Sequence, residues 1–135
     1  EAVVYIDDYA HHPEELSMLL KSAKALFPDR RLRVIFQPHL YSRTNDFAKG
    51  FADSLDLADE VILLDIYPAR ELPMEGVSSA LILDHMGISN KHILSKASAL
   101  QWVEATKPDL LITAGAGDID QLVEPIRKIL EKQQS

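Results

Sequence analysis

The chain has 135 residues, of which 47% are hydrophobic and 26% charged, a composition typical of one globular domain rather than of a disordered chain. Its 14 Lys and Arg against 21 Asp and Glu leave a net charge of −7, which argues against a general nucleic-acid binder. The absence of cysteine excludes disulfides, thiolate metal sites and a cysteine nucleophile. The sequence has no apolar run long enough for a membrane span and no signal-peptide pattern, so we expect a cytoplasmic protein.

Short apolar runs alternate with segments of helical period, which is the pattern of an α/β fold. The runs are nearly continuous in apolar residues, as expected for strands buried on both faces. The expected strands are Ala2–Ile6, Leu32–Phe36, Val61–Leu64, His92–Leu94 and Leu110–Thr113. The expected helices are Pro13–Phe27, a segment from Ser42 or Thr44 to Leu55, Ser78–Met86, a short one around Leu100 and Val103, and a last one from about Asp120. We therefore predict a single three-layer, Rossmann-like α/β domain, with a mostly parallel sheet and helices on both faces.

In parallel sheets of this kind, ligands bind beyond the carboxyl ends of the strands. Polar and aromatic residues are concentrated in the segments that follow the expected strands, well beyond what turns require. These segments are residues 7–13, 37–44, 65–71 and 114–118. The functional site is therefore predicted to be built from these loops.

The first of these segments holds two carboxylates and two imidazoles within six residues. Asp7, Asp8, His11 and His12 could form a metal cluster, an acid–base pair, or a polar platform for a nucleotide and a small charged substrate. Alternatively, the carboxylates end a strand and His12 caps the next helix. Adjacent histidines on an extended segment point in opposite directions, which disfavours a shared metal ion.

The second segment places His39 and Arg43 four residues apart, so both project to one side if the chain is helical there. Near a helix N-terminus, the Arg43 guanidinium and free backbone N–H groups would form a carboxylate or phosphate site. The alternative is a solvated arginine at the start of a helix. We expect neighbouring parallel strands to bring this segment to His11.

The other two segments carry weaker signals. The turn Ala114-Gly115-Ala116-Gly117-Asp118 could approach a phosphate, but it is neither GxGxxG nor a Walker A sequence. Small residues that permit tight strand-to-helix packing explain it equally well. Arg70 lies in an exposed, proline-containing loop and could face a substrate.

Together, residues 7–13, 36–44, 64–71 and 114–119 resemble the C-terminal domain of the Mur ligases, ATP-dependent enzymes of peptidoglycan synthesis, and in particular the branch that adds L-alanine. The resemblance covers essentially the whole chain. A sister branch that reattaches a recycled tripeptide shares a variant of the first motif but lacks the PHxYxRT segment. Two further hypotheses are a stand-alone nucleotide-binding module and a metallo-hydrolase.

The resemblance implies a three-domain enzyme, of which residues 1–135 form the last, amino-acid-positioning domain. The UDP-sugar and central ATPase domains would be missing, and no GKT or GKS P-loop occurs here. ATP would phosphorylate the lactyl carboxylate of UDP-N-acetylmuramate, and the amine of L-alanine would displace the phosphate from the acyl phosphate. Mg²⁺ and its ligands would be held upstream. We therefore expect no catalytic residue, no metal ligand and no turnover in this fragment.

The expected partners are L-alanine, ATP, UDP-N-acetylmuramate and the upstream domains of the same chain, without nucleic acid or membrane. By resemblance, Asp7 meets the ribose or adenine of ATP. Many family members carry a second arginine where this chain has Leu40, so Arg70 or a backbone N–H is expected to compensate. Tyr9, His11 and His39 are expected to form the wall of the alanine pocket. Arg43 is expected to bind the carboxylate of alanine. Further candidate contacts are Arg70, Ala116 and Gly117.

Overall fold

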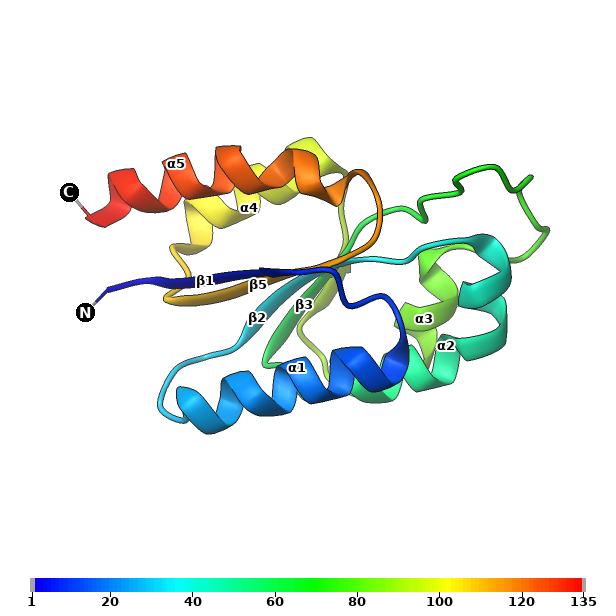
Figure 1. Cartoon of the computed structure of the whole chain (residues 1–135), viewed down its shortest axis with the longest axis horizontal. Helices are drawn as coiled ribbons and strands as arrows, with labels where there is room; N and C mark the ends of the chain where they lie inside the picture. Colours follow the sequence, from blue (N-terminus) through cyan, green and yellow to red (C-terminus); the bar gives the residue numbers. More distant parts are fainter. Residues whose placement is uncertain (1, 135) are drawn as a thin grey trace.

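The computed structural model describes residues 2–134 and contains one sheet of five parallel strands in the order β1-β5-β2-β3-β4 (Figure 1). The strands are β1 (Val4–Asp8), β2 (Arg33–Gln37), β3 (Glu60–Leu63), β4 (Lys91–Ile93) and β5 (Leu110–Gly115). The last strand in the chain thus lies inside the sheet, between the first two. The predicted α/β class and parallel sheet are confirmed.

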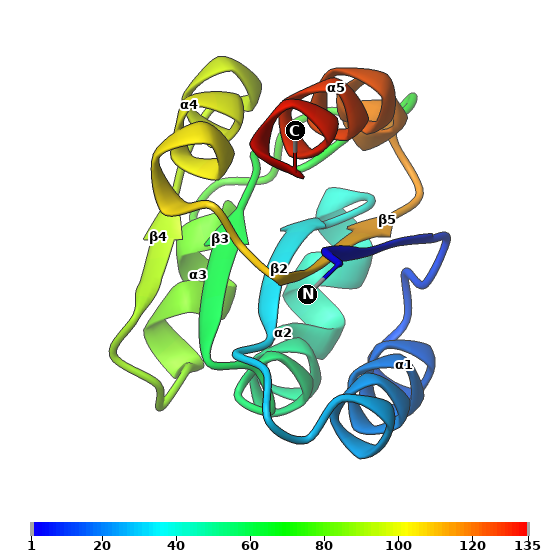
Figure 2. The same cartoon turned by 90° about the vertical axis from the view of Figure 1, so that its left-hand side faces the viewer.

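Helices cover both faces of this sheet, as predicted (Figures 1 and 2). On one face lie α1 (Pro13–Leu26), α2 (Tyr41–Leu55) and α3 (Ser79–His85), and on the other α4 (Lys96–Thr106) and α5 (Val123–Gln134), the latter preceded by the 3-10 helix η1 (Asp118–Leu122). Along β2, Val34 and Phe36 pack in the first core, while Ile35 packs in the second. Because side chains alternate along a strand, a continuous apolar run fills both cores.

Local sequence accounts for the ends of α1. Pro13 occupies the first turn, where its missing N–H costs no hydrogen bond, and Glu14 and Glu15 complement the positive end of the helix dipole. The helix ends before Phe27, and Pro28 follows. The predicted range of α1 is therefore correct to within one residue.

The first strand lies two residues later than predicted, at Val4–Asp8 instead of Ala2–Ile6. Its pairing with β5 runs from Val4 opposite Leu110 to Asp8 opposite Ala114. Strand pairing uses backbone groups, so the ladder continues past the last apolar side chain into the polar Asp7 and Asp8. The two carboxylates consequently end the strand.

A long connection, residues 64–78, joins β3 to α3 and projects from the carboxyl end of the sheet (Figure 1). It is tied to the segment after β2 by two backbone hydrogen bonds, from Tyr67 N to Pro38 O and from Leu40 N to Tyr67 O, both 2.9 Å. The base of this loop is therefore fixed beside His39, while its tip, including Leu72, is exposed.

Candidate functional site

The loops that follow β1, β2, β3 and β5 meet at the carboxyl end of the sheet. The segments that carry His11 and His39 do meet there, but not because their strands are neighbours, since β5 lies between β1 and β2. The His11 and His39 ring centroids are 6.2 Å apart at an angle of 61°. The two loops therefore approach each other beyond the end of β5.

Four rings form what we call the aromatic row: Tyr9, His11, His39 and Tyr67. The Tyr9 and His11 centroids are 5.1 Å apart, edge to face, and the His39 and Tyr67 rings are stacked at 5.8 Å. Tyr9 is 70% exposed, so the outer end of the row faces solvent. Three of these residues were predicted to share a pocket wall, and the structure brings them together; Tyr67 joins them from the loop after β3.

Backbone carbonyls orient both imidazoles of the row. His39 Nδ1 donates to Ala116 O, and His11 Nδ1 donates to Tyr9 O at 2.9 Å. A carbonyl oxygen can only accept, so Nδ1 carries the proton in each ring. In the neutral form, Nε2 is therefore left as a hydrogen-bond acceptor on both histidines.

Beside this row, Glu15 receives the backbone N–H of His11 at 3.2 Å, and its carboxylate lies 3.6 Å from His11 Nδ1. The His11 backbone hydrogen bond lowers the pKa of Glu15, which favours its charged form. The His12 ring instead packs against Phe47, with 5.0 Å between the ring centroids. His12 is the N-cap residue of α1, but its side chain makes no capping hydrogen bond. The adjacent histidines thus have different neighbours, as the extended segment predicts.

Arg43 lies in the first turn of α2 and is half-buried. Within residues 2–134 its guanidinium has no hydrogen-bond or ion-pair partner. The condition for a shared face of His39 and Arg43, a helix over both residues, is not met, because the helix begins only at Tyr41 and His39 instead forms an extended bridge with Tyr67. Arg43 therefore lies in the first turn of α2 and His39 on the segment between β2 and α2, both at the carboxyl end of the sheet.

The turn between them passes through a strained residue, Leu40, whose φ is 72°. Such a conformation is rare for a residue with a branched side chain and costs on the order of 1–3 kcal/mol. It is held by the bond from Leu40 N to Tyr67 O and by Thr44, whose Oγ1 donates to Leu40 O at 2.8 Å. Strain of this kind is characteristic of functional sites.

The N-terminus of α2 is not a free anion site, contrary to the sequence-based expectation. The Glu71 carboxylate accepts from Ser42 N at 3.1 Å and from Ser42 Oγ. These two hydrogen bonds, led by that of the hydroxyl, lower the pKa of Glu71. A carboxylate from the loop after β3 therefore already caps the helix, which makes the Arg43 side chain the stronger candidate donor for an incoming anion.

Asp7 ends a hydrogen-bonded chain of side chains. Thr113 Oγ1 donates its one proton to Asp7 Oδ1 at 2.7 Å. The Thr113 hydroxyl must therefore accept the hydrogen bond that joins it to the Tyr5 hydroxyl, which is also 2.7 Å long. Burial raises the pKa of Tyr5 to about 12, so it stays a donor. Asp7 also lines a cavity of about 130 Å³ with Asp8, Tyr9, Gly115, Gly117, Ile119 and Asp120.

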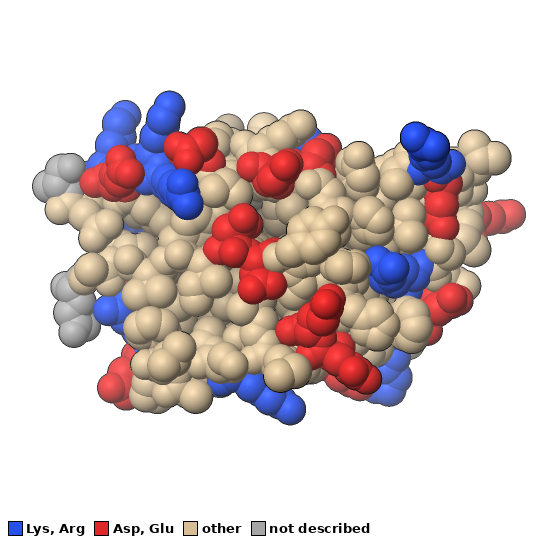
Figure 3. Space-filling view, in the orientation of Figure 1, with Lys and Arg blue, Asp and Glu red and all other residues tan. Residues whose placement is uncertain are grey.

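On the face of the molecule that Figure 3 shows, acidic side chains gather near the middle, over β1. Asp7 and Asp8, the last residues of β1, are both exposed. Carboxylates accept hydrogen bonds and repel phosphates, so this part of the surface suits hydroxyl or amino donors better than a phosphate chain.

The glycine-rich turn is explained by packing. At Gly115, φ is +137° and a Cβ would lie 2.7 Å from Gln37 O. At Gly117, a Cβ would lie 2.6 Å from Gln37 Oε1 and 2.8 Å from Tyr67 Cβ. Of the two interpretations of this turn, close packing accounts for both glycines, and the Ala116 carbonyl is used by His39.

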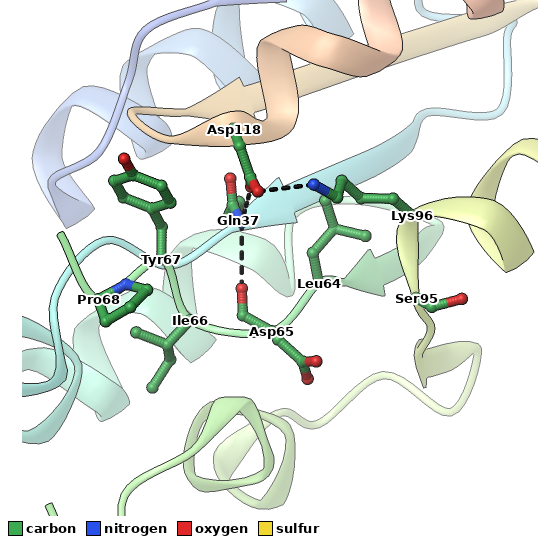
Figure 4. A pocket seen from close by; sticks show the side chains of 9 residues that line it. All are labelled: Gln37, Leu64, Asp65, Ile66, Tyr67, Pro68, Ser95, Lys96 and Asp118. Carbon is green, nitrogen blue, oxygen red and sulfur yellow. Dashed lines mark hydrogen bonds and ion pairs between the residues drawn. The ribbon is translucent and has the colours of Figure 1, made fainter. Parts of the chain in front are cut away.

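The sequence analysis missed a network beside the site, formed by the buried Gln37 and the partly exposed Asp118 and Lys96 (Figure 4). Gln37 Nε2 donates to Asp118 Oδ1 at 2.7 Å, and Lys96 Nζ donates to Asp118 Oδ2 at 2.6 Å. Burial raises the pKa of Asp118, but these donors outweigh it and lower the pKa. The network lines a cavity of about 250 Å³ with Leu64, Asp65, Ile66, Tyr67, Pro68 and Ser95. Its only sequence signal is a glutamine directly after the apolar residues Val34–Phe36 of β2.

Arg70 is exposed next to Ala69, whose φ is 53°, and makes no hydrogen bond or ion pair within the described residues. Across residues 2–134, no group of three or more His, Asp or Glu side chains is placed to hold a metal ion. In the same residues, no helix is both long enough and apolar enough to cross a membrane.

The fold and site together define an α/β domain whose loops at the carboxyl ends of its strands form a binding surface. A sequence model of the family described as "Mur ligase, glutamate ligase domain" matches residues 1–117. The chain belongs to this Mur ligase family.

Named relatives agree with this family. Curated proteins named UDP-N-acetylmuramate–L-alanine ligase from Cytophaga hutchinsonii and Parabacteroides distasonis are 50% and 54% identical, over 97% and 98% of this chain but 28% and 29% of their own length. The crystal structure of UDP-N-acetylmuramate–alanine ligase from Thermotoga maritima has a TM-score of 0.67 at 30% identity, covering 98% of this chain and 27% of that one. A murein peptide ligase from Psychrobacter arcticus has a TM-score of 0.74 at 21% identity, which shows a shared fold. The chain spans less than a third of the length of these relatives.

Proposed function

We propose that this chain is the C-terminal, amino-acid-positioning domain of an ATP-dependent ligase that joins L-alanine to UDP-N-acetylmuramate in the cytoplasm. Support comes from relatives of that name at 50% and 54% identity over nearly the whole chain. The observation that carries the proposal is an unpaired, half-buried Arg43 at the same sheet end as two histidines that offer acceptor nitrogens.

These residues suit the two ends of an amino acid. The Arg43 guanidinium supplies a fork of donors that matches a carboxylate. The free Nε2 of His11 or His39 would accept a hydrogen bond from the ammonium group. The exposed Asp7 carboxylate would accept from the ribose hydroxyls or the adenine amino group of ATP.

In this proposal the reaction makes an acyl phosphate of UDP-N-acetylmuramate at the expense of ATP. The alanine amine then attacks the acyl carbon, phosphate leaves, and the amine loses a proton as the amide forms. Mg²⁺ would supply charge neutralisation on the phosphates. We propose that its ligands lie in the rest of the protein; within residues 2–134 no group of three or more His, Asp or Glu side chains is placed to hold it. The role of this domain is orientation, which contributes up to about 7–11 kcal/mol to a reaction of this kind.

The test is phosphate release by the complete protein that contains this chain. We expect release that requires ATP, Mg²⁺, UDP-N-acetylmuramate and L-alanine together. Residues 1–135 alone are the matched control and should release none, because the sequence has no P-loop. Release that does not depend on L-alanine would overturn the proposal. Activity only with a peptide in place of L-alanine would also overturn it and would favour the tripeptide-adding branch.

A further inference from the structure

The geometry points to Gln37 as a positioning residue: we propose that its amide, by donating to Asp118 and Asp65 O, sets the place of His39 and of the loops after β3 and β5 and thereby the orientation of the bound amino acid. This inference rests on the function proposed above. Gln37 touches no reacting group in that scheme and acts through His39 and Tyr67.

Each polar atom of the Gln37 amide has a partner. Nε2 donates to Asp118 Oδ1 at 2.7 Å and to Asp65 O at 3.2 Å (Figure 4). Oε1 accepts from Ile119 N at 2.8 Å. If the amide were reversed, its oxygen would face two acceptors, Asp118 Oδ1 and Asp65 O. The orientation with Nε2 toward these two oxygens is therefore the one that the hydrogen bonds allow. Because Gln37 is only 5% exposed, water cannot replace these partners.

Those partners lie on the loops that build the site. Asp118 and Ile119 directly follow the turn whose Ala116 carbonyl holds the His39 ring. Asp65 lies two residues before Tyr67, which stacks on His39. The Gln37 main chain itself leads in two residues to His39. One side chain thus joins the ends of β2, β3 and β5.

The packing around the amide leaves little room for adjustment. A Cβ on Gly117 would lie 2.6 Å from Gln37 Oε1 and 2.8 Å from Tyr67 Cβ, so these three residues are in close contact. A shift of the amide therefore displaces the Gly117 turn and Tyr67 together. A misplacement of about 1 Å in a positioned substrate can lower a rate about 100-fold.

The donor character of residue 37 is what the inference requires, and Gln37→Glu removes it with little change in shape. The new carboxyl would face the Asp118 carboxylate, with Lys96, Asp65 and Tyr67 as the other titratable groups around the cavity. Burial and Asp118 would raise its pKa. In acid it would protonate and donate to Asp118 again, so the variant should recover as pH falls.

The experiment compares the complete wild-type protein with Gln37→Glu at about pH 8 and about pH 6. At the higher pH we expect kcat/KM for L-alanine to fall about 100-fold while the KM for ATP changes less than about threefold. At the lower pH the deficit, measured against wild type at the same pH, should shrink at least about fivefold. Gln101→Glu, the same change on the exposed face of α4, is the matched control and should behave as wild type.

A second variant separates positioning from folding. In Gln37→Glu/Asp118→Asn, the new amide donates to the new carboxylate, so activity at about pH 8 should recover at least about tenfold over Gln37→Glu. If Gln37→Glu does not fold, Asp118→Asn alone should lower kcat/KM for L-alanine about tenfold, because one amide oxygen cannot serve both Gln37 and Lys96.

Two results would overturn the inference. One is a Gln37→Glu protein with wild-type kinetics. The other is a deficit that neither acid nor Asp118→Asn relieves, as a purely structural role predicts. A wild-type protein without alanine-dependent activity would overturn the proposed function as well, whereas an active wild type with either of these results overturns the inference alone.

Discussion

The rings of His11 and His39 lie 6.2 Å apart, although the strands that precede them, β1 and β2, are separated by β5. Each ring is held through Nδ1 by a backbone carbonyl, so the pair presents two Nε2 atoms. The arrangement suits hydrogen bonding to a cation more than metal coordination, because zinc sites use three or four protein ligands.

We therefore expect no tight zinc binding by this chain. Titration followed by calorimetry should show no dissociation constant in the nanomolar range, because within residues 2–134 no group of three or more His, Asp or Glu side chains is placed to hold a metal ion. Nanomolar binding that is lost in His11→Ala but kept in His92→Ala, whose residue is exposed on β4, would contradict this and revive the metallo-hydrolase hypothesis.

The Glu71 cap on α2 predicts an acid-sensitive contribution to stability. The pKa of Glu71 is lowered from its ordinary value of 4.5, so the folded state favours the carboxylate. Its contribution is then present above about pH 4.5 and is lost as pH falls through the folded-state pKa. In thermal unfolding of the chain, Glu71→Gln should lower the midpoint near neutral pH, and the difference from wild type should vanish in acid.

Glu75→Gln is the control for this prediction, since Glu75 is exposed in the same loop and makes no hydrogen bond or ion pair within residues 2–134. It should leave the midpoint unchanged at either pH. A difference between Glu71→Gln and wild type that is equally large at about pH 3 and about pH 7 would show that charge is not the cause.

Gly117→Ala should destabilise the chain by about 1–3 kcal/mol, because the new methyl group would overlap Gln37 Oε1 and Tyr67 Cβ. Urea unfolding measures the loss. Gly87→Ala provides the comparison and should cost less, since its Cβ would meet only the Asp56 carboxylate, at 3.3 Å. Equal stability of Gly117→Ala and wild type would mean that the turn is looser than the structure shows.

The architecture could be predicted because its signals are local. Apolar runs such as 32–36 and the helical period of 13–27 are visible within a few residues, and both cores follow from them. Strand order could not be predicted in this way, because the residues of an apolar strand do not specify which other strand pairs with it. The place of β5 between β1 and β2 depends on how all five strands pack together.

The site was predictable to the same extent. Residues directly after strands, such as Tyr9, His11 and His39, were found because the carboxyl ends of parallel strands meet. What escaped prediction depends on contacts distant in sequence: Gln37 and Ile119 are 82 residues apart, and Ser42 and Glu71 are 29 apart. The positive φ of Leu40 likewise follows from Tyr67 and Thr44, not from leucine itself.

Arg43 should bind the alanine carboxylate in the complete enzyme, and Arg43→Ala tests this. A hydrogen bond to a charged group is worth about 1.5–3 kcal/mol, and Leu40 leaves no neighbouring arginine to share the task. If the contact persists throughout the reaction, its loss raises the KM for L-alanine by about 10- to 150-fold. Steady-state kinetics should show a much smaller change in the KM for ATP.

The remaining kinetic constants distinguish the possible roles of Arg43. If the guanidinium meets a phosphate, the KM for ATP rises and that for alanine does not; if it also aligns the amine, kcat falls as well.

Arg31→Ala, on an exposed residue just before β2 at the opposite end of the sheet, should change none of these values. Arg70→Ala should raise the alanine KM by less than Arg43→Ala, because Arg70 is exposed and water competes for its donors. An unchanged alanine KM in a folded Arg43→Ala enzyme would remove this residue from the site.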